Sequence, residues 1–316
     1  MMFGGIPNLL VLVLAIALDL TFGEPPNPMH PVVWMGKFIA LLMKARVERI
    51  RSHITQFLYG VAVVLVTVGV FSAAAFFLLR WLAGMSPVAY VLVGGVLLKT
   101  TFSLRGLHRA AEKVRDLLAK KKLPEARSAV LALVGRNTSE LNEGQVVSAT
   151  IESVAENSCD SFVAPLFFFL ILGLPGAVAY RAINTLDNSI GFRGEYEYLG
   201  KFAARLDDLV NFIPARVTAL LFVAASWMGR HDPLNAWHIM LRDRGQTSSI
   251  NGGWTMGAMA GGLGVTLEKV GHYKLGNGEK PLLPSTIDAA LNIMVLMAFG
   301  WTLITALGQA GYYVAT

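Results

Sequence analysis

Long apolar stretches, separated by short polar segments, dominate the chain. A helix needs about 20 mostly apolar residues to cross the hydrocarbon core of a bilayer. A shorter amphipathic or interfacial helix is predicted at residues 31–43. The apolar pattern predicts spanning helices at residues 6–22, 57–80, 87–104, 161–180, 209–228 and 289–308. We therefore expect an all-α fold, a polytopic integral membrane helical bundle.

Two longer polar segments interrupt this pattern. Residues 105–160 predict a cytoplasmic helical insert, in which Leu107 to Lys122 has the charge pattern of an amphipathic helix. Residues 229–288 form a second polar segment, which is richer in glycine and turn residues. Because no repeat or low-complexity linker divides the chain, we expect residues 1–316 to form a single membrane domain.

The segment 161–180 contains a break at Gly173-Leu174-Pro175-Gly176. Such breaks are tolerated at membrane depth where the backbone is buried in protein, so a re-entrant hairpin is possible there. The basic loops 44–56 and 105–136 predict the cytoplasmic side, because basic residues are enriched in cytoplasmic loops. Six full spans would then put 181–208 outside. We favour a hairpin at 161–180 that returns the chain to the cytoplasmic face.

Composition agrees with a membrane protein. The 316 residues are 54% hydrophobic and only 15% charged, whereas a soluble domain is about a quarter charged. The formal charge of +6 would suit nucleic acid, but the basic residues cluster beside apolar segments. That placement favours an anionic leaflet, so we expect membrane lipid and no nucleic acid as partner. No basic region precedes residues 6–22, which we interpret as a retained transmembrane helix. Cys159 is the only cysteine, and we expect it to pack in the core.

Ionisable side chains crowd into apolar sequence between Arg136 and Arg216. Glu152, Glu156 and Asp160 recur every four residues, so one helix would carry all three on one face, with Asn157 beside them. Carboxylates at this spacing repel unless a cation, an arginine or a magnesium–nucleotide complex lies against them. The alternative is a solvated acidic face.

A second polar group follows. Asn184, Asp187, Asn188 and Gly191 share a helical face. The other polar residues of this stretch are helix neighbours or isolated arginines: Arg193, Arg205, Asp207, Asp208 and Asn211. Carboxylates with amides suit magnesium, and arginines suit phosphate. The mixture favours phosphate chemistry over proton transport; the alternative is a salt-bridge network that only holds helices together.

Two motifs lie outside this stretch. Asp19 ends the first apolar helix, and a proline-rich turn leads to His30, which either binds phosphate, shuttles a proton or is a satisfied loop residue. Asn251 and Trp254 begin a glycine-rich segment that ends at Gly264. We expect these two to contact a ligand and the later glycines to permit close helix packing. The chain has no P-loop motif.

Four parts of the chain, 18–36, 135–166, 180–219 and 251–265, together resemble the adenosylcobinamide-phosphate synthase family. These are the CbiB/CobD-type membrane proteins of cobalamin biosynthesis. The most specific pieces are Glu152-Ser153-Val154-Ala155-Glu156-Asn157, Asn184-Thr185-Leu186-Asp187, Ala204-Arg205-Leu206-Asp207-Asp208 and Ile213-Pro214-Ala215-Arg216. One departure is Asn137, which stands where an aspartate is usual in the family.

The resemblance implies an ATP-dependent amide ligase in the prokaryotic cell (inner) membrane, where it would be a multi-pass protein. It would join the carboxylate of adenosylcobyric acid to the amine of aminopropanol or of its O-phosphate. ATP and Mg2+ would enter as a substrate complex, with the corrinoid as second substrate. The expected partners are these small molecules, membrane lipid, and either a second copy of the chain or other late cobalamin enzymes.

The resemblance also distributes roles. Catalysis would fall to Glu152, Glu156, Asp160 and Asp187, of which Glu156, Asp160 and Asp187 would hold magnesium. The remaining residues would bind substrate and its phosphates: Asp19, His30, Arg136, Asn157, Asn184, Arg193, Arg205, Asp207, Asp208, Asn211, Arg216, Asn251 and Trp254. The alternatives left open are a transporter, a signalling paralogue without ligase activity, and a membrane phosphoalcohol transferase.

Overall fold

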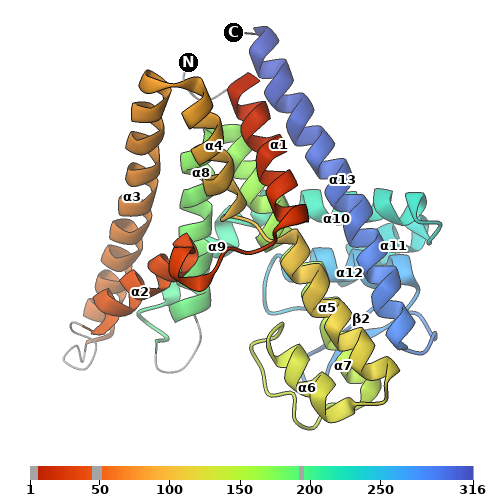
Figure 1. Cartoon of the computed structure of the whole chain (residues 1–316). Helices are drawn as coiled ribbons and strands as arrows, with labels where there is room; N and C mark the ends of the chain where they lie inside the picture. The colour runs from red at the N-terminus through yellow and green to blue at the C-terminus, as the bar shows by residue number, and fades with distance from the viewer. Residues whose placement is uncertain (1–5, 45–51, 192–195, 316) are drawn as a thin grey trace. The chain divides into compact units, whose positions relative to one another are not determined.

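The computed structural model describes residues 6–44, 52–191 and 196–315, and these are mostly helical (Figure 1). In the first half of the chain the elements are α1 (Ile6–Thr21), η1 (Asn27–Met29), α2 (Pro31–Lys44), α3 (His53–Met85), α4 (Pro87–Lys99), α5 (Leu104–Ala119), α6 (Leu123–Leu131) and α7 (Glu143–Ser158). The second half contains the π-helix η3 (Cys159–Val163), then α8 (Ala164–Ile190), α9 (Lys201–Val210), α10 (Phe212–Met228), α11 (Pro233–Asp243), α12 (Gly252–Leu263), β1 (Leu267–Lys269), β2 (Tyr273–Leu275) and α13 (Pro284–Ala315).

The predicted all-α membrane fold is confirmed. Among the described residues, four helical runs are long and apolar enough to cross a membrane: His53–Met85, Pro87–Ala119, Glu143–Ile190 and Pro284–Gly311. The pair α9 and α10 makes a fifth if it is counted as one span. Helix α1 is apolar but has 16 residues, which is short for a span. The side of the membrane on which each loop lies stays a prediction.

The chain separates into two compact units, a division that no linker in the sequence indicated. Unit 1 comprises Met1–Ser103, Ala164–Val210 and Thr305–Thr316, and unit 2 comprises Leu104–Val163 and Asn211–Ile304. Unit 2 therefore combines the predicted 105–160 insert with α10, α11, α12, the hairpin and most of α13. Each unit holds part of the predicted polar constellation.

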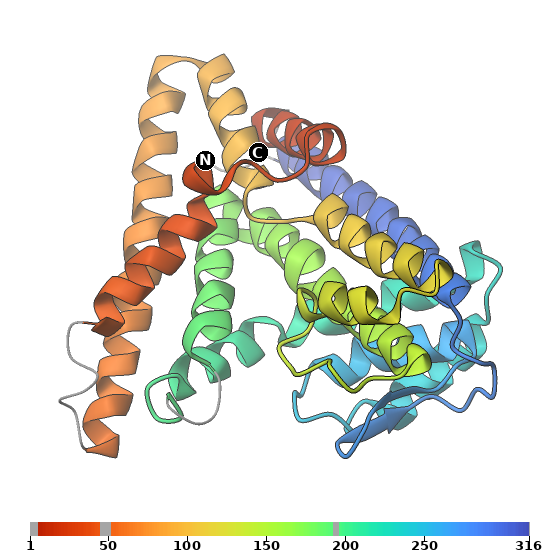
Figure 2. The ribbon, with the colours of Figure 1, turned by 60° about the horizontal axis from the view of Figure 1, so that its bottom comes forward.

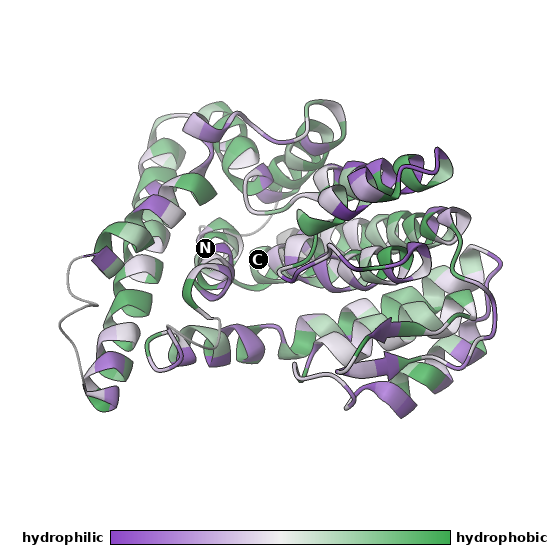
Figure 3. Cartoon of the chain, turned by 90° about the horizontal axis from the view of Figure 1, so that it is seen from below, coloured by the Kyte–Doolittle hydropathy of each residue, from purple (hydrophilic) through white to green (hydrophobic). Residues whose placement is uncertain are grey.

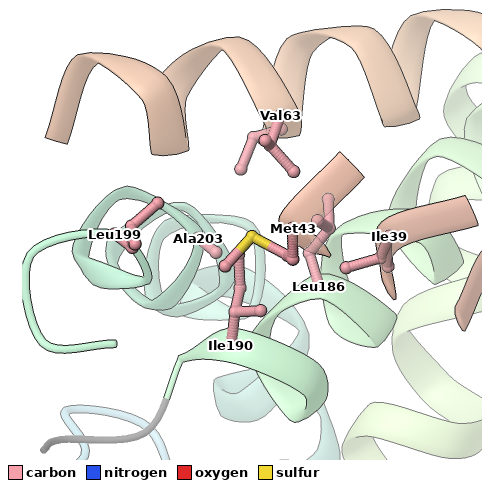
Figure 4. Packing of buried hydrophobic residues seen from close by; sticks show 8 residues of the cluster. Ile39, Met43, Val63, Leu186, Ile190, Leu199 and Ala203 are labelled. Carbon is pink, nitrogen blue, oxygen red and sulfur yellow. The ribbon is translucent and has the colours of Figure 1, made fainter. Parts of the chain in front are cut away.

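The core of unit 1 joins helices that are distant in the sequence. Figure 4 shows Ile39 and Met43 from α2, Val63 from α3, and Leu186 and Ile190 from α8 in one cluster, with Leu199 and Ala203 beside them. Burying these apolar side chains fixes the C-terminal half of α8 against α9. The polar residues on the other faces of α8 and α9 are thereby held in place.

Helix α8 bends at the predicted break. Gly173 has a φ of 66°, a left-handed conformation that glycine adopts without steric cost. The rings of Phe168 and Tyr180 stack with centroids 5.4 Å apart, although twelve residues of straight helix would span about 18 Å. The two halves of α8 therefore turn toward each other, as a hairpin requires. Whether this hairpin is re-entrant stays a prediction.

Unit 2 is organised around α12, which is nearly all buried. A stripe of three glycines, Gly253, Gly257 and Gly261, faces the backbone of α11. A methyl group at Gly261 would lie 2.8 Å from the Cα of Ala236, and one at Gly257 would lie 3.3 Å from the Cα of Met240. The later glycines thus serve close helix packing, as predicted.

Two strands complete unit 2. They form an antiparallel hairpin, β1–β2, in which Leu267 pairs with Leu275, drawn as blue arrows in Figure 2. Figure 3 shows hydrophilic and hydrophobic residues sharing individual helices, as amphipathic helices require. Helix α5 is such a helix, with Leu107, Ala111, Val114 and Leu118 buried on one side. The predicted helix from Leu107 to Lys122 lies largely within it.

Candidate functional site

Helix α7 carries two of the predicted carboxylates and begins at a capping box. The side chain of Asn142 accepts a hydrogen bond from the backbone N–H of Gln145, and the Gln145 side chain accepts one from the backbone N–H of Asn142. These bonds satisfy two donors that a helix end leaves unpaired. Glu152 and Glu156 follow on the same helix, one turn apart.

Glu152 is buried, with 4% of its surface exposed, and is held by three partners. The hydroxyls of Ser148 and Tyr273 donate to its carboxylate at 2.7 and 2.8 Å, and Nη2 of Arg136 lies 3.3 Å away. A buried carboxylate is tolerable only when it is paired and hydrogen-bonded in this way. Glu152 therefore holds Arg136 and the hairpin in place.

The hairpin is joined to α7 through these same groups. Ser148 Oγ also accepts the backbone N–H of Glu268 on β1 at 2.8 Å. Burial, and then the neighbouring charges of Glu152 and Glu156, raise the pKa of the Tyr273 hydroxyl. Tyr273 therefore keeps its proton and remains a donor to Glu152 across the ordinary pH range.

Glu156 is exposed and faces the N-terminus of α12. Its Oε1 lies 3.6 Å from the position that a Cβ at Gly252 would take. Ser249 Oγ accepts the backbone N–H groups of Asn251 at 3.2 Å and of Gly252 at 3.4 Å. A helix N-terminus carries partial positive charge and attracts anions or acidic groups. The Glu156 carboxylate therefore lies beside a positively polarised helix end, where Ser249 accepts the N–H groups of Asn251 and Gly252.

Two arginines flank Trp254 at this helix end. Arg216 Nη1 donates to Phe212 O and to Asn251 Oδ1, both at 2.7 Å, and its Cζ lies 4.8 Å from the Trp254 ring centroid. Arg244 is exposed, and its Cζ lies 5.2 Å from the same ring. Arg216 thus donates to Phe212, Asn251 and Ile250, whereas Arg244 is an exposed residue whose guanidinium lies over Trp254. Glu156, Asn251, Trp254 and the two arginines form the α12 N-terminal cluster.

Asp160 does not continue the α-helical spacing of Glu152 and Glu156. Helix α7 ends at Ser158, and Asp160 lies in the π-helix η3. A π-helix has i to i+5 bonds, so the regular α-helical spacing ends before Asp160. The predicted common face of three acids stays a prediction for Asp160. Nearby, the Cys159 thiol donates to Asn211 Oδ1 at 3.9 Å, and both residues are buried, in agreement with the packing role expected of Cys159.

In unit 1 the second predicted group does come together. Asn184 Nδ2 donates to Asp207 Oδ1 at 3.4 Å, and Arg181 Nη1 donates to Asn184 Oδ1 at 3.3 Å. Asp187 and Asp208 lie close enough for their charges to repel. Two facing carboxylates favour a cation or a shared proton between them. The facing surfaces of α8 and α9 thus carry a polar network. A network that only holds the helices together, the alternative to phosphate chemistry, would contain the same contacts.

The N-terminal motif forms a separate network around Lys99. This lysine is 4% exposed, and its Nζ lies 3.1 Å from Asp19 Oδ1 and 2.9 Å from Glu24 Oε1. His30 Nε2 lies 2.8 Å from Glu24 Oε2, and its Nδ1 accepts the backbone N–H of Val32. Both ring nitrogens are therefore engaged, which favours the satisfied loop residue over a proton shuttle.

Glu24 shows the electrostatic strength of this network. Burial by itself would raise the pKa of its carboxyl group. Hydrogen bonds from His30, Ser103 and Lys99, together with the charge of Lys99, outweigh burial and lower the pKa to about 2. Asp19 and His30 therefore belong to a tightly paired set, and their predicted role in substrate binding stays a prediction.

Two of the remaining predicted residues, Arg205 and Asn157, lie apart from these clusters within the part of the chain that the structure describes. Arg205 is exposed on α9, and the amide of Asn157 donates to Ser153 on its own helix at 3.0 Å. Arg193 lies outside the described residues. Within the described ranges, no group of three or more histidine, cysteine, aspartate and glutamate side chains could hold a metal ion. Magnesium ligation by Glu156, Asp160 and Asp187 therefore stays a prediction, and one carboxylate plus substrate phosphates is the commoner arrangement for this ion.

Three residues of these networks were missed by sequence reasoning. Lys99 ends an apolar span, and a lone cation there is itself a signal of a buried partner. Arg244 and Tyr273 lie in the polar segment 229–288, where charged and aromatic residues are ordinary. No local pattern marks them, since Tyr273 pairs with Glu152 across 121 positions and Arg244 contacts Trp254 outside its own helix.

Comparison with known proteins agrees with the resemblance. The family model for CobD/Cbib protein matches residues 12–295. The chain is 48% identical over 297 residues to the "Cobalamin biosynthesis protein CobD" of Dehalococcoides mccartyi (strain CBDB1). The aligned region covers 94% of this chain and 96% of that protein. It is 42% identical over 299 residues to the "Probable cobalamin biosynthesis protein CobD" of Thermococcus kodakarensis, covering 93% of each. No solved structure matches the chain. The chain belongs to the CobD/Cbib protein family.

Proposed function

We propose that this protein acts in cobalamin biosynthesis as an ATP-dependent amide ligase of the inner membrane, which it crosses several times. It joins the carboxylate of adenosylcobyric acid to the amine of aminopropanol or of its O-phosphate. The products are adenosylcobinamide or its phosphate, ADP and inorganic phosphate. Family membership and the cobalamin biosynthesis names of the relatives support the pathway, and the site geometry supports the reaction type.

The observation that carries the reaction type is the α12 N-terminal cluster. An exposed carboxylate, Glu156, stands beside the N-terminal turn of α12, and the guanidinium groups of Arg216 and Arg244 lie over Trp254. Backbone N–H groups and arginines bind phosphate, and a carboxylate can take up either a proton or a phosphate-bound magnesium ion. These are the groups that phosphoryl transfer to a carboxylate needs.

The chemistry has two steps. The substrate carboxylate attacks the γ-phosphorus of ATP, which forms an acyl phosphate and releases ADP. The amine then attacks the acyl carbon, phosphate leaves with the C–O bonding pair, and the amine gives up one proton. In this scheme Arg244 binds the phosphates, Arg216 keeps Asn251 and Trp254 in position, and Glu156 accepts the amine proton or orients magnesium. Magnesium, when bound, neutralises phosphate charge.

The test is amide formation by purified protein. The protein is incubated with ATP, magnesium, adenosylcobyric acid and each amine in turn, and the new amide is identified by mass spectrometry together with released phosphate. We expect Glu156→Gln to lower the turnover number by roughly 10²-fold or more, the usual contribution of a general acid–base group. Glu140→Gln changes another exposed glutamate, outside the cluster, and should behave as the wild type.

The same assay separates the rival functions. A transporter or a signalling paralogue would not couple ATP consumption to amide formation. A phosphoalcohol transferase would consume an activated nucleotide-alcohol in place of ATP and a carboxylate. Wild-type turnover of Glu156→Gln with unchanged KM for ATP would remove that residue from the reaction, and no amide from either amine would refute the ligase assignment.

A further inference from the structure

A cavity lies in unit 2, at the end of α12 that is remote from Asn251. It is a cavity of about 580 Å³ whose walls include Gly262 and Gly264 of α12 and its C-cap. Helix α12 has twelve residues and is therefore about 18 Å long. The cavity is thus separate from the α12 N-terminal cluster.

Three basic side chains line this cavity. Arg230 and His231 come from the connection between α10 and α11, and Lys280 comes from the segment before α13. No ion pair within 4.0 Å joins Arg230 or Lys280 to an acid of the described chain. The one carboxylate in the lining, Asp232, accepts the backbone N–H of Asn235 at 2.9 Å and so caps α11. The Asp232 carboxylate offsets one of the two permanent cations, Arg230 and Lys280, so the lining keeps a net positive charge.

The positive charge of the cavity also affects the pKa of His231. Burial, and then the charge of Lys280, lower the pKa of His231. The imidazole is therefore neutral at pH 7 and can both donate and accept hydrogen bonds. Arg230 and Lys280 remain as the two permanent cations.

The walls are fixed by the backbone. The N–H of His231 donates to Ser226 O at 2.8 Å, and the N–H of Asp232 donates to Gly262 O at 3.3 Å. The connection that carries the basic residues is thus tied to both α10 and α12. Next to it, the hydroxyl of Ser226 is fully buried, has no hydrogen-bond partner within the described chain, and lies against the cavity-lining Gly262.

We propose that this cavity binds the phosphate group of an anionic ligand. Charge-assisted hydrogen bonds from arginine and lysine are common contacts of a bound phosphate, and the lining offers both side chains. A volume of about 580 Å³ lies within the range of small-molecule sites and far exceeds a bare phosphate ion. The ligand therefore carries an organic body, which is either a phosphorylated small molecule or the headgroup of an anionic lipid.

The experiment uses the full chain in nanodiscs of phosphatidylcholine, a lipid without net charge. Inorganic phosphate and glycerol 3-phosphate are titrated against thermal stability, in the Arg244→Gln background so that the proposed ATP site contributes less. We expect Lys280→Gln to weaken phosphate-dependent stabilisation by about tenfold or more, the usual effect of losing one charge-assisted contact. Lys120→Gln changes an exposed lysine at the end of α5 and serves as the matched control.

A second arm tests the lipid. Phosphatidylglycerol is mixed into the nanodiscs, and the lipid that stays with the protein is measured by native mass spectrometry. Retention by the wild type and its loss in Lys280→Gln assigns the cavity to a headgroup, whereas stabilisation by glycerol 3-phosphate alone assigns it to a soluble ligand. Arg230→Gln repeats both arms in case Lys280→Gln does not fold. If neither probe distinguishes the cavity variants from Lys120→Gln, the proposal is overturned.

Discussion

Replacing Gly253 by alanine tests whether close packing of α12 positions the candidate site. The new methyl group would lie 2.8 Å from the carbonyl carbon of Arg244 and 3.0 Å from its Cα, so backbone has to move. Overpacking of this kind lowers the free energy of unfolding by about 1–3 kcal/mol. The lower chain entropy of alanine in the unfolded state offsets about 0.4–1 kcal/mol of that loss. The expected net loss is about 1–2 kcal/mol, or roughly 2–8 °C in Tm.

The displaced backbone belongs to Arg244, whose guanidinium lies over Trp254. We therefore expect Gly253→Ala to raise the KM for ATP as well as to lower the Tm. Both are measured on detergent-purified protein, by thermal unfolding at a fixed scan rate and by the amide-forming assay.

The matched control is Gly257→Ala on the same face of the helix. Its methyl group would meet the Cα of Met240 at 3.3 Å, a contact that a shift of a few tenths of an ångström relieves. It should change the Tm by less than about 2 °C, since overpacking and chain entropy nearly cancel. Equal losses in the two variants, or no loss in either, would refute the argument that α12 is held by direct backbone contact.

Three further predictions follow from the charged networks. Tyr273→Phe removes one donor from the buried carboxylate of Glu152 and should cost about 1.5–3 kcal/mol of unfolding free energy, whereas Tyr198→Phe should cost little; equal Tm losses would contradict this. Lys99→Met leaves Asp19 buried without that charge and should cost about 3–5 kcal/mol, and a double variant with Asp19→Asn should lose less than the sum of the two. The folded-state pKa of Glu24, about 2, lies below its ordinary value of 4.5, so its stabilisation is complete above pH 4.5 and fades toward pH 2. The Tm of the wild type should therefore fall more steeply over that range than the Tm of Glu24→Gln, and parallel curves would disprove the pairing.

The helices could be predicted because their signal is local. Apolar runs of sufficient length located α3, α4, α10 and α13, although their ends differ from the predicted ones by up to seven residues, and the glycine and proline at 173–176 located the bend in α8. The packing role of the glycine stripe of α12 could be predicted for the same reason, because its spacing of four residues is visible in the sequence.

The pairings within the site could not be predicted in the same way. Tyr273 reaches Glu152 across 121 positions, and Arg216 reaches Asn251 across 35. The family resemblance implied a catalytic role for Glu152, and the structure shows its carboxylate occupied by three donors. Glu156 is exposed and Glu152 is buried. This difference depends on tertiary packing, so the spacing of the two residues along the helix could not predict it.

The burial of Lys99 has a consequence for how the protein is made. Asp19 and Glu24 leave the ribosome some 75 to 80 positions ahead of the lysine that neutralises them. An acid in apolar surroundings is costly until that cation arrives. We therefore expect the first helices to reach their final packing only after translation has passed Ser103. A truncated chain that ends inside α4 should be degraded during biogenesis.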